Sequence, residues 1–204
     1  MMTAIEIGRL LRAGTSGFVA GCRVSQVDAP IFGGLVRAPL GENYNVYGLI
    51  YDIRIDDDGI VRQLVTAEKV DANVVADNRI NRNVPIEVSV LTVGYQQNGT
   101  IRHLLPPRPP LSLDVIYQCS PKELCDFTGH GRFGYFRHIL RTQDAPIGEL
   151  IAAHLEQASA AHAQSGSPQW TEAATRELIT LLRDDYPALM GVLGALSDAR
   201  TSSP

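Results

Sequence analysis

The chain has 204 residues, of which 45% are hydrophobic and 20% are charged, and its formal net charge is -4. These values are typical of an ordinary globular protein with a sizeable core, and they argue against a strongly cationic nucleic-acid surface, although a local basic patch stays open. Three cysteines, Cys22, Cys119 and Cys125, are too few for a disulfide framework, which predicts a reducing, cytoplasmic location. No apolar run approaches the roughly 18 residues of a membrane span, so we expect no membrane association.

The first 118 residues consist of short, β-branched segments separated by turn residues. The first turn is Gly14-Thr15-Ser16-Gly17, which does not match the G-x-S-x-G sequence of a nucleophile elbow because position 18 is Phe18 and not glycine. Alternating apolar residues predict four strands before the first hairpin, over residues 5–11, 18–27, 35–38 and 46–55.

Two hairpins are predicted from Asx-Gly pairs, because glycine accepts the positive φ of a primed turn. Asp57-Asp58-Gly59 is expected to join the fourth strand to a return strand over residues 60–65, and this reading is preferred to a calcium loop. Asn98-Gly99 is expected to join strands over residues 88–95 and 100–105. Gly48 and Gly94 lie inside strands, where they favour bulges, and the whole pattern predicts a small antiparallel β-barrel.

A proline-rich segment follows the second hairpin. Residues 105–111 read LPPRPPL, and four prolines remove four backbone donors and favour an extended conformation. We expect a stiff strap here, followed by a last short strand over residues 114–118. Its exposed, preorganised residues Arg108, Pro109 and Pro110 suit docking to a partner, because little ordering entropy is lost on binding.

The periodicity becomes helical after residue 119. Ser120-Pro121-Lys122-Glu123 is a capping box with proline at the first helical position. A short helix is expected over residues 135–141, a longer one from Asp144 and Pro146, another with Thr171 as its N-cap, and a last one from Pro187. The predicted fold is therefore α+β, with a β-barrel over residues 1–118, a helical region over 119–200 and a disordered tail over 201–204.

Two nucleotide-binding motifs are missing. A P-loop needs a lysine directly after a glycine, whereas Lys69 follows Glu68 and Lys122 follows Pro121. No G-x-G-x-x-G sequence follows a strand, so a Rossmann site is not supported either. We therefore exclude a P-loop ATPase, and we assign no catalytic residue, no cofactor and no metal ligand.

Two groups of residues that contain histidine are candidate metal sites. Cys119, Cys125, His130 and His138 form the only Cys/His pattern, but its spacing is wider than that of structural zinc knuckles. His154 and His162 lie eight residues apart on a predicted helix, and we expect them to be solvated. A metal-dependent enzyme around residues 119–138 stays open as an alternative function.

Arginines and tyrosines are interspersed through the β-rich half. Small barrels use such side chains to clamp and stack single-stranded nucleic acid, which gives a second alternative function. Acidic residues interleave with them, so a mixed solvated surface is the simpler interpretation. The side chains concerned are Arg37, Arg54, Arg62, Arg79, Arg82, Arg102, Arg108, Tyr44, Tyr47, Tyr51 and Tyr95.

Several short motifs resemble one known domain. Ile7-Gly8, residues 30–36 (PIFGGLV), residues 46–52 (VYGLIYD) and residues 109–117 (PPLSLDVIY) are similar to the HAS-barrel of HerA-type DNA translocases and rotary ATP synthases. The resemblance spans roughly residues 5–120. In that family the barrel precedes a P-loop ATPase domain, helps to order subunits into a ring and offers a docking surface for a nuclease. Here a helical segment follows the barrel instead.

The resemblance implies assembly or docking rather than motor activity. Our leading hypothesis is a non-enzymatic adaptor whose barrel docks to a separately encoded ATPase or nuclease in DNA processing. Direct contact with nucleic acid and homo-oligomerisation stay open. The residues expected to bind the partner are Arg108, Pro109, Pro110, Tyr47 and Tyr51.

Overall fold

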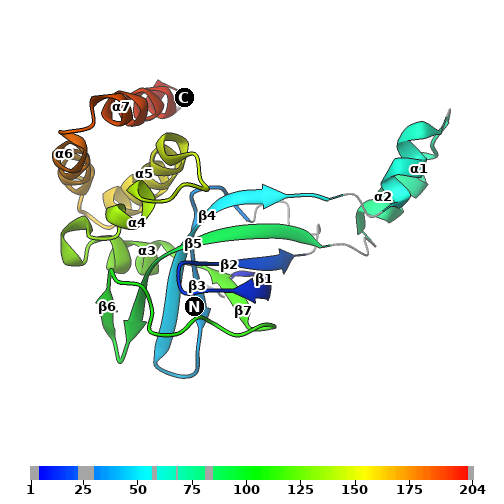
Figure 1. Ribbon diagram of the computed structural model, residues 1–204, viewed down its shortest axis with the longest axis horizontal. Helices are drawn as coiled ribbons and strands as arrows, with labels where there is room; N and C mark the ends of the chain where they lie inside the picture. Colours follow the sequence, from blue (N-terminus) through cyan, green and yellow to red (C-terminus); the bar gives the residue numbers. More distant parts are fainter. Residues whose placement is uncertain (1–4, 23–29, 57–58, 68, 81–84, 202–204) are drawn as a thin grey trace.

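A computed structural model describes residues 5–22, 30–56, 59–67, 69–80 and 85–201 (Figure 1). The strands are β1 (Ile5–Ala13), β2 (Gly17–Cys22), β3 (Leu35–Pro39), β4 (Tyr44–Arg54), β5 (Ile86–Gln97), β6 (Thr100–Arg102) and β7 (Val115–Gln118). The helices are α1 (Ile60–Thr66), α2 (Ala72–Ile80), α3 (Pro121–Thr128), α4 (Phe136–Leu140), α5 (Ile147–Gln164), α6 (Trp170–Leu182) and α7 (Tyr186–Thr201), with a 3-10 turn at Gly131–Phe133.

Six antiparallel strands close into a barrel. Their order around it is β1-β2-β5-β4-β3-β7, and β7 pairs back with β1. The short β6 pairs only with β5, to which the Asn98-Gly99 turn joins it. The predicted α+β class and antiparallel barrel are confirmed, and residues 23–27 of the predicted 18–27 strand lie outside the described residues.

The strand β4 is buried on both faces. Val46 and Ile50 point into the barrel, whereas Tyr47 and Leu49 point outward into a second apolar core beneath the helices. Successive side chains of a strand alternate between its faces, so a continuous apolar run is what a doubly covered strand requires. This explains why residues 46–50 show no polar alternation.

Gly48 lies at a bulge in the β4–β5 pairing, where Val93 of β5 is the extra residue. The pairing of β4 with β5 shifts between Tyr47 and Gly48, and a Cβ at Gly48 would lie 2.3 Å from Cγ1 of Val90. Only glycine avoids this clash, because it has no Cβ. The predicted irregularity at Gly48 is confirmed.

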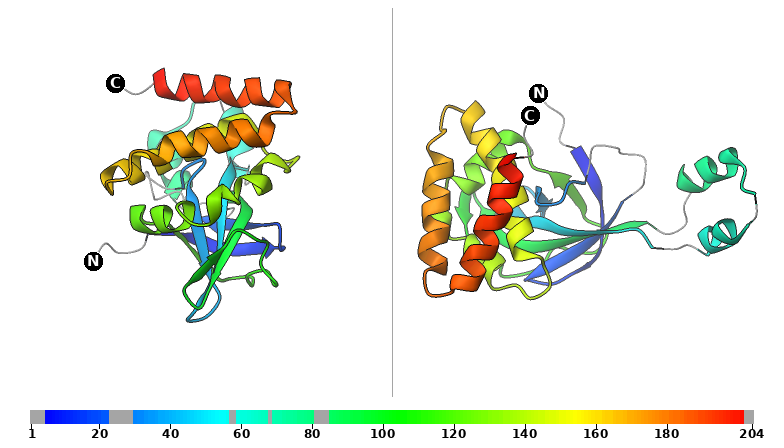
Figure 2. Two further views of the ribbon diagram at one scale, coloured as in Figure 1. Left: turned by 90° about the vertical axis from the view of Figure 1, so that its left-hand side faces the viewer. Right: turned by 90° about the horizontal axis from the view of Figure 1, so that it is seen from above.

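The predicted hairpin at Asp57-Asp58-Gly59 is wrong. Asp57 and Asp58 lie outside the described residues, but α1 begins directly after Gly59, so residues 60–65 form no return strand. The true partner of β4 is β5, with Arg54 opposite Glu87. Figures 1 and 2 show α1 and α2 as a pair of helices that projects from the far end of the β4–β5 ribbon, and we call them the projecting pair.

The second hairpin is confirmed in a shorter form. Asn98 and Gly99 both have positive φ, as a type I′ turn requires. The returning β6 ends at Arg102 rather than near residue 105. Beyond His103 the chain leaves the sheet and enters the proline strap.

The helix α3 is attached to the barrel at its first turn. The capping box predicted at Ser120 and Glu123 is present. The Glu123 carboxylate also accepts a hydrogen bond from Arg37 of β3 at 2.7 Å, and the Arg37 guanidinium lies over the Tyr117 ring. Burial of the Glu123 carboxyl would raise its pKa, but hydrogen bonds from Ser120 and the Arg37 charge bring the pKa below its ordinary value.

The remaining helices form a layer on one side of the barrel, opposite the projecting pair (Figure 2). The central helix α5 packs against α3, α4, α6 and α7. Two expected boundaries differ: α6 begins at Trp170, so Thr171 lies inside the helix rather than capping it, and α7 extends to Thr201. The rest of the predicted tail lies outside the described residues. No helix among the described residues is long and apolar enough to cross a membrane.

A single apolar core joins the helical layer to the barrel, and we call this interface the seam. Gly33, with φ +75°, lets the loop before β3 lie directly against α5, since a Cβ there would lie 2.7 Å from the Ala153 Cβ. The buried seam residues come from both parts of the chain, and they include Leu35, Tyr47, Leu49, Val93, Leu124, Phe127, Tyr135, Phe136, Ile139, Leu150, Ile151 and Leu155.

Candidate functional site

The predicted strap is an irregular, surface segment between β6 and β7. Arg108 is exposed, Pro109 is half-buried and Pro110 is buried. Pro109 and Pro110 therefore contact the rest of the protein, whereas the Arg108 side chain is exposed to solvent. Three of the five expected partner-binding residues thus lie together on one short segment.

Hydrogen bonds fix the end of the strap. The Leu111 amide donates to Oδ2 of Asp114 at 2.8 Å, and the Leu113 amide donates to the Leu10 carbonyl at 2.8 Å. The Arg9 guanidinium donates to the Leu113 carbonyl at 3.1 Å. Leu113 itself has φ +72°, a conformation that a leucine adopts only when its surroundings impose it.

Four leucines on and beside the strap point to solvent. Leu104 is 51% exposed, Leu105 44%, Leu111 68% and Leu113 70%. Single exposed leucines are common on protein surfaces, but four within ten residues of a rigid segment make a cluster. We call these leucines together with Arg108 the strap surface.

The two tyrosines expected to bind a partner lie elsewhere. Tyr47 is only 4% exposed, and its ring lies 4.8 Å from that of Phe127 in the seam. Burial raises the pKa of Tyr47, and its hydroxyl lies 3.4 Å from Oε1 of Gln96. Tyr47 is therefore a core residue and not a surface contact, which corrects the prediction for it.

Tyr51 lines an open cavity of about 370 Å³ between the barrel and the loop before α5. The Gly14–Gly17 turn forms one wall, and Thr142 and Asp144 form another. Arg12 also lines it, where its guanidinium pairs with the Glu87 carboxylate at 2.9 Å. Ser16 is the only hydroxyl of the turn in this lining, and no histidine lines the cavity among the described residues.

The sequence predicts solvated histidines on α5, but both are buried. His154 is fully buried, and its Nδ1–H donates to the Gly33 carbonyl at 3.2 Å. The Tyr135 hydroxyl then donates to Nε2 at 3.2 Å. Both ring nitrogens are satisfied in the neutral form, and burial lowers the pKa of His154 to about 4.

His162 of α5 is buried between Thr128 of α3 and Trp170 of α6. Its ring stacks on Trp170 with centroids 4.4 Å apart, and its Nε2 lies 2.8 Å from the Thr128 hydroxyl. Burial lowers the pKa of His162 below its ordinary value. The expectation that His154 and His162 are solvated is therefore wrong for both.

The Cys/His pattern does not assemble into a metal site. Cys119 is buried, Cys125 lies beside the Ser165 hydroxyl at 3.7 Å, and Nε2 of His138 faces the His103 carbonyl at 3.2 Å. Within the part of the chain that the structure describes, no three His, Cys, Asp or Glu side chains are placed to hold a metal ion. This geometry gives no support to the metal-dependent alternative.

Comparison with known proteins does not extend these observations. No family model matches the chain, and no curated protein matches it. The resemblance to the HAS-barrel therefore stays a prediction that depends on the short motifs quoted above.

Sequence reasoning found the strap but missed what surrounds it. The proline pattern predicts the extended segment but not the exposure of the leucines that flank it. The histidines of α5 lie on the buried face of the helix, not on the solvated face that was predicted. A signal existed for the second: His154 and His162 fall on the same helical stripe as Ile151, Leu155 and Ala158.

Proposed function

We propose that this protein is a non-enzymatic adaptor that docks through its strap surface to a separately encoded ATPase or nuclease. The single observation that carries the proposal is the rigid display of four exposed leucines beside Arg108. The HAS-barrel resemblance suggests the class of partner, because docking and subunit ordering are what that barrel does in its own family.

Rigidity favours docking for a physical reason. Association costs translational freedom, and ordering a loop at the same time adds to that cost. The hydrogen bonds of Leu111, Leu113 and Asp114 hold the strap in one conformation before any partner arrives. Burying the exposed leucines then contributes roughly 1.5–3 kcal/mol for each side chain that becomes fully covered.

Arginine adds specificity to such an apolar surface. The Arg108 guanidinium presents several donors in a planar fork, which suits a carboxylate on the partner. Arginine is enriched at interface cores, where other charged residues are depleted.

The experiment is affinity capture from native extract with three baits. The first is the unaltered chain, and the second carries Leu105→Ser, Leu111→Ser and Leu113→Asn, because asparagine tolerates the positive φ at position 113. The third carries Ile179→Ser, Leu181→Ser and Met190→Ser, which remove three exposed apolar side chains from α6 and α7. Circular dichroism first verifies that all three baits are folded.

We expect quantitative mass spectrometry to find an ATPase or nuclease with the first and third baits, reduced at least about ten-fold with the second. Titration of that purified protein against each bait then measures direct binding. Recovery of no ATPase or nuclease contradicts the proposal, and so does equal recovery by the strap variant.

A further inference from the structure

Two segments of the chain carry positive charge and no acidic residue. These are residues 88–113 and 127–143, which lie between Glu87 and Asp114 and between Asp126 and Asp144. The positive side chains they contribute are Arg102, Arg108, Arg132, Arg137 and Arg141, with His103, His130 and His138. Charge is therefore segregated in a protein whose net charge is negative.

The fold brings these two segments together at His103. The His103 Nε2–H donates to the Phe127 carbonyl at 3.0 Å, and the Arg137 guanidinium donates to the His103 carbonyl. A Cβ at Gly131 would lie 3.1 Å from Nδ1 of His103, so the turn that carries Arg132 lies against this ring. The end of β6 and the α3–α4 connection thus share one surface.

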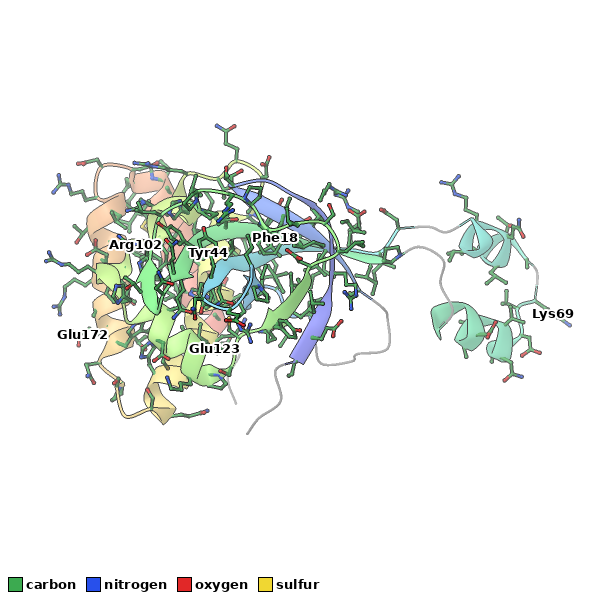
Figure 3. All side chains as sticks on the ribbon, turned by 90° about the horizontal axis from the view of Figure 1, so that it is seen from below. Phe18, Tyr44, Lys69, Arg102, Glu123 and Glu172 are labelled. Atoms are coloured by element: carbon green, nitrogen blue, oxygen red, sulfur yellow. The ribbon has the colours of Figure 1, made fainter. Side chains whose placement is uncertain are left out.

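The same surface continues to the strap through a pair of aromatic rings. Arg102 lies opposite Tyr95 in the β5–β6 pairing, and Tyr95 stacks on Tyr44 at 5.6 Å. Arg108 is close enough to Tyr44 to act against the burial that raises the pKa of its hydroxyl. Figure 3 shows Arg102 and Tyr44 at the end of the barrel nearer the helical layer, far from Lys69 on the projecting pair.

Four exposed arginines elsewhere in the described chain have acidic partners. Arg12 pairs with Glu87, Arg54 with Asp52, Arg176 with Glu172 and Arg183 with Asp184. Among the described residues, by contrast, no carboxylate lies within 4.0 Å of the charged atoms of the five arginines 102, 108, 132, 137 and 141, which we call the arginine face.

The positive groups of this surface repel one another. Burial is the main cause that lowers the pKa of His103 to about 4, and the charges of His130, Arg137 and His138 lower it further. Burial is also the main cause that lowers the pKa of His138, and the charges of Arg137 and Arg141 add to it. The lowered pKa values keep both rings neutral at neutral pH, and an anion bound here would offset the positive charge of the neighbouring arginines.

We propose that the arginine face binds the sugar–phosphate backbone of nucleic acid without reading its bases. Guanidinium groups on β6, the strap, the Gly131–Phe133 turn and the α4 segment offer several hydrogen-bond donors for phosphate oxygens, spread over this surface. The only helix that contributes, α4, has five residues and is too short to enter a major groove as a recognition element.

A nucleic acid fits this surface better than an acidic protein does. Protein interfaces have a desolvated apolar centre, whereas nucleic-acid interfaces are polar and positively charged. No large apolar side chain is exposed among the described residues between Leu113 and Ile179, a range that includes three of the five arginines. The inference goes beyond docking through the strap, and it shares only Arg108 with the strap surface.

The test is fluorescence anisotropy with a labelled single strand of mixed sequence, the corresponding duplex and polyglutamate. The binding variant carries Arg102→Gln, Arg132→Gln and Arg141→Gln, all exposed and without a carboxylate partner among the described residues. The matched control carries Arg54→Gln, Arg176→Gln and Arg183→Gln, which remove the same charge from exposed ion pairs.

We expect the unaltered chain and the control to bind one or both nucleic acids at 50 mM salt, and the binding variant to lose roughly ten- to hundred-fold in affinity. For the single strand, three lost phosphate contacts lower the slope of log K against log salt by about 2. The strap variant retains binding, which separates this inference from the docking proposal.

Three outcomes overturn the inference. The first is that the unaltered chain binds neither nucleic acid at low salt. The second is that the two triple variants lose affinity equally, which indicates a non-specific charge effect. The third is binding to polyglutamate alone, which assigns the face to an acidic protein.

Discussion

His154 connects three parts of the molecule with one ring. Gly33 belongs to the loop before β3, Tyr135 precedes α4, and His154 itself lies in α5. The carbonyl of Gly33 can only accept, so the proton is fixed on Nδ1 and the Tyr135 hydroxyl must donate to Nε2. A second proton would have to occupy Nε2, the atom that accepts the hydrogen bond from Tyr135, and the charge would lie in a fully buried site.

The pH dependence of stability follows from this arrangement. The folded-state pKa of His154 is about 4 and the ordinary value is 6.5, so the folded state binds fewer protons than the unfolded state between these values. Its contribution is fully present above pH 6.5 and decreases as the pH falls toward 4, by on the order of 3 kcal/mol.

We expect His154→Gln to flatten this dependence, because the amide side chain does not titrate. Urea unfolding at pH 7.5, 6, 5 and 4.5 measures the free energy of unfolding for both proteins, and His130→Gln provides an exposed control. His103 keeps its own lowered pKa in the unaltered protein and in His154→Gln, so the difference between these two curves isolates His154. Parallel curves for the unaltered protein and His154→Gln contradict this assignment.

At the scale of elements, the projecting pair is the clearest departure from the pattern predicted by sequence. Ile60, Val61, Leu64 and Val65 are spaced as one face of a helix, but their β-branched composition and the preceding Asp-Gly favoured a return strand. The helical spacing of these residues agrees with the structure, whereas their composition does not. The strand that pairs with the end of β4 is β5, which begins at Ile86. Local turn chemistry does not specify which later strand pairs.

We predict that the barrel folds without the projecting pair. None of the described residues of α1 or α2 belongs to either apolar core. Replacing residues 56–85 by Asn-Gly joins Ile55 to Ile86 in the register that already places Arg54 opposite Glu87. We expect the unfolding temperature to change by only a few degrees in a thermal melt, since a tight hairpin replaces a long connection.

Loss of the cooperative transition in this deletion variant contradicts the prediction. A matched variant that replaces residues 98–99 by Gly-Asn keeps the chain length and alters the other hairpin turn. Its stability measures how much a β5 turn alone contributes.

The strap and the arginine face differ in how far the sequence predicts them. Four prolines in seven residues impose an extended surface segment whatever surrounds them, so the strap was found and Arg108 was placed correctly. The arginine face was not found, because it joins residues 102–108 to residues 132–141 through His103. Such a surface depends on tertiary packing, which no local pattern encodes.

At the scale of the whole molecule, the two apolar cores share strands β3, β4 and β5. Leu35 and Val36 are neighbours in β3 but belong to different cores, as do Leu49 and Ile50 in β4. Unfolding the helical layer therefore exposes the outer faces of the same strands that form the barrel. The barrel and helices should behave as one cooperative unit.

Trp170 allows a direct measurement of this coupling. It is the only tryptophan, it is buried at the start of α6, and its Nε1–H donates to the Thr128 carbonyl at 3.3 Å. We expect its fluorescence and the far-ultraviolet circular dichroism to follow a single urea transition with the same midpoint. An earlier fluorescence transition means that the helical layer unfolds separately.

The closed barrel also bears on self-association of the chain. Among the described strands, β6 alone has one neighbour, and it is three residues long with an exposed arginine at its end. Fibrillar aggregation begins when an unpaired strand accepts a strand from another molecule, and a short, charged strand is a poor template for it. The native protein should therefore resist amyloid growth, which would first require opening a pair of barrel strands.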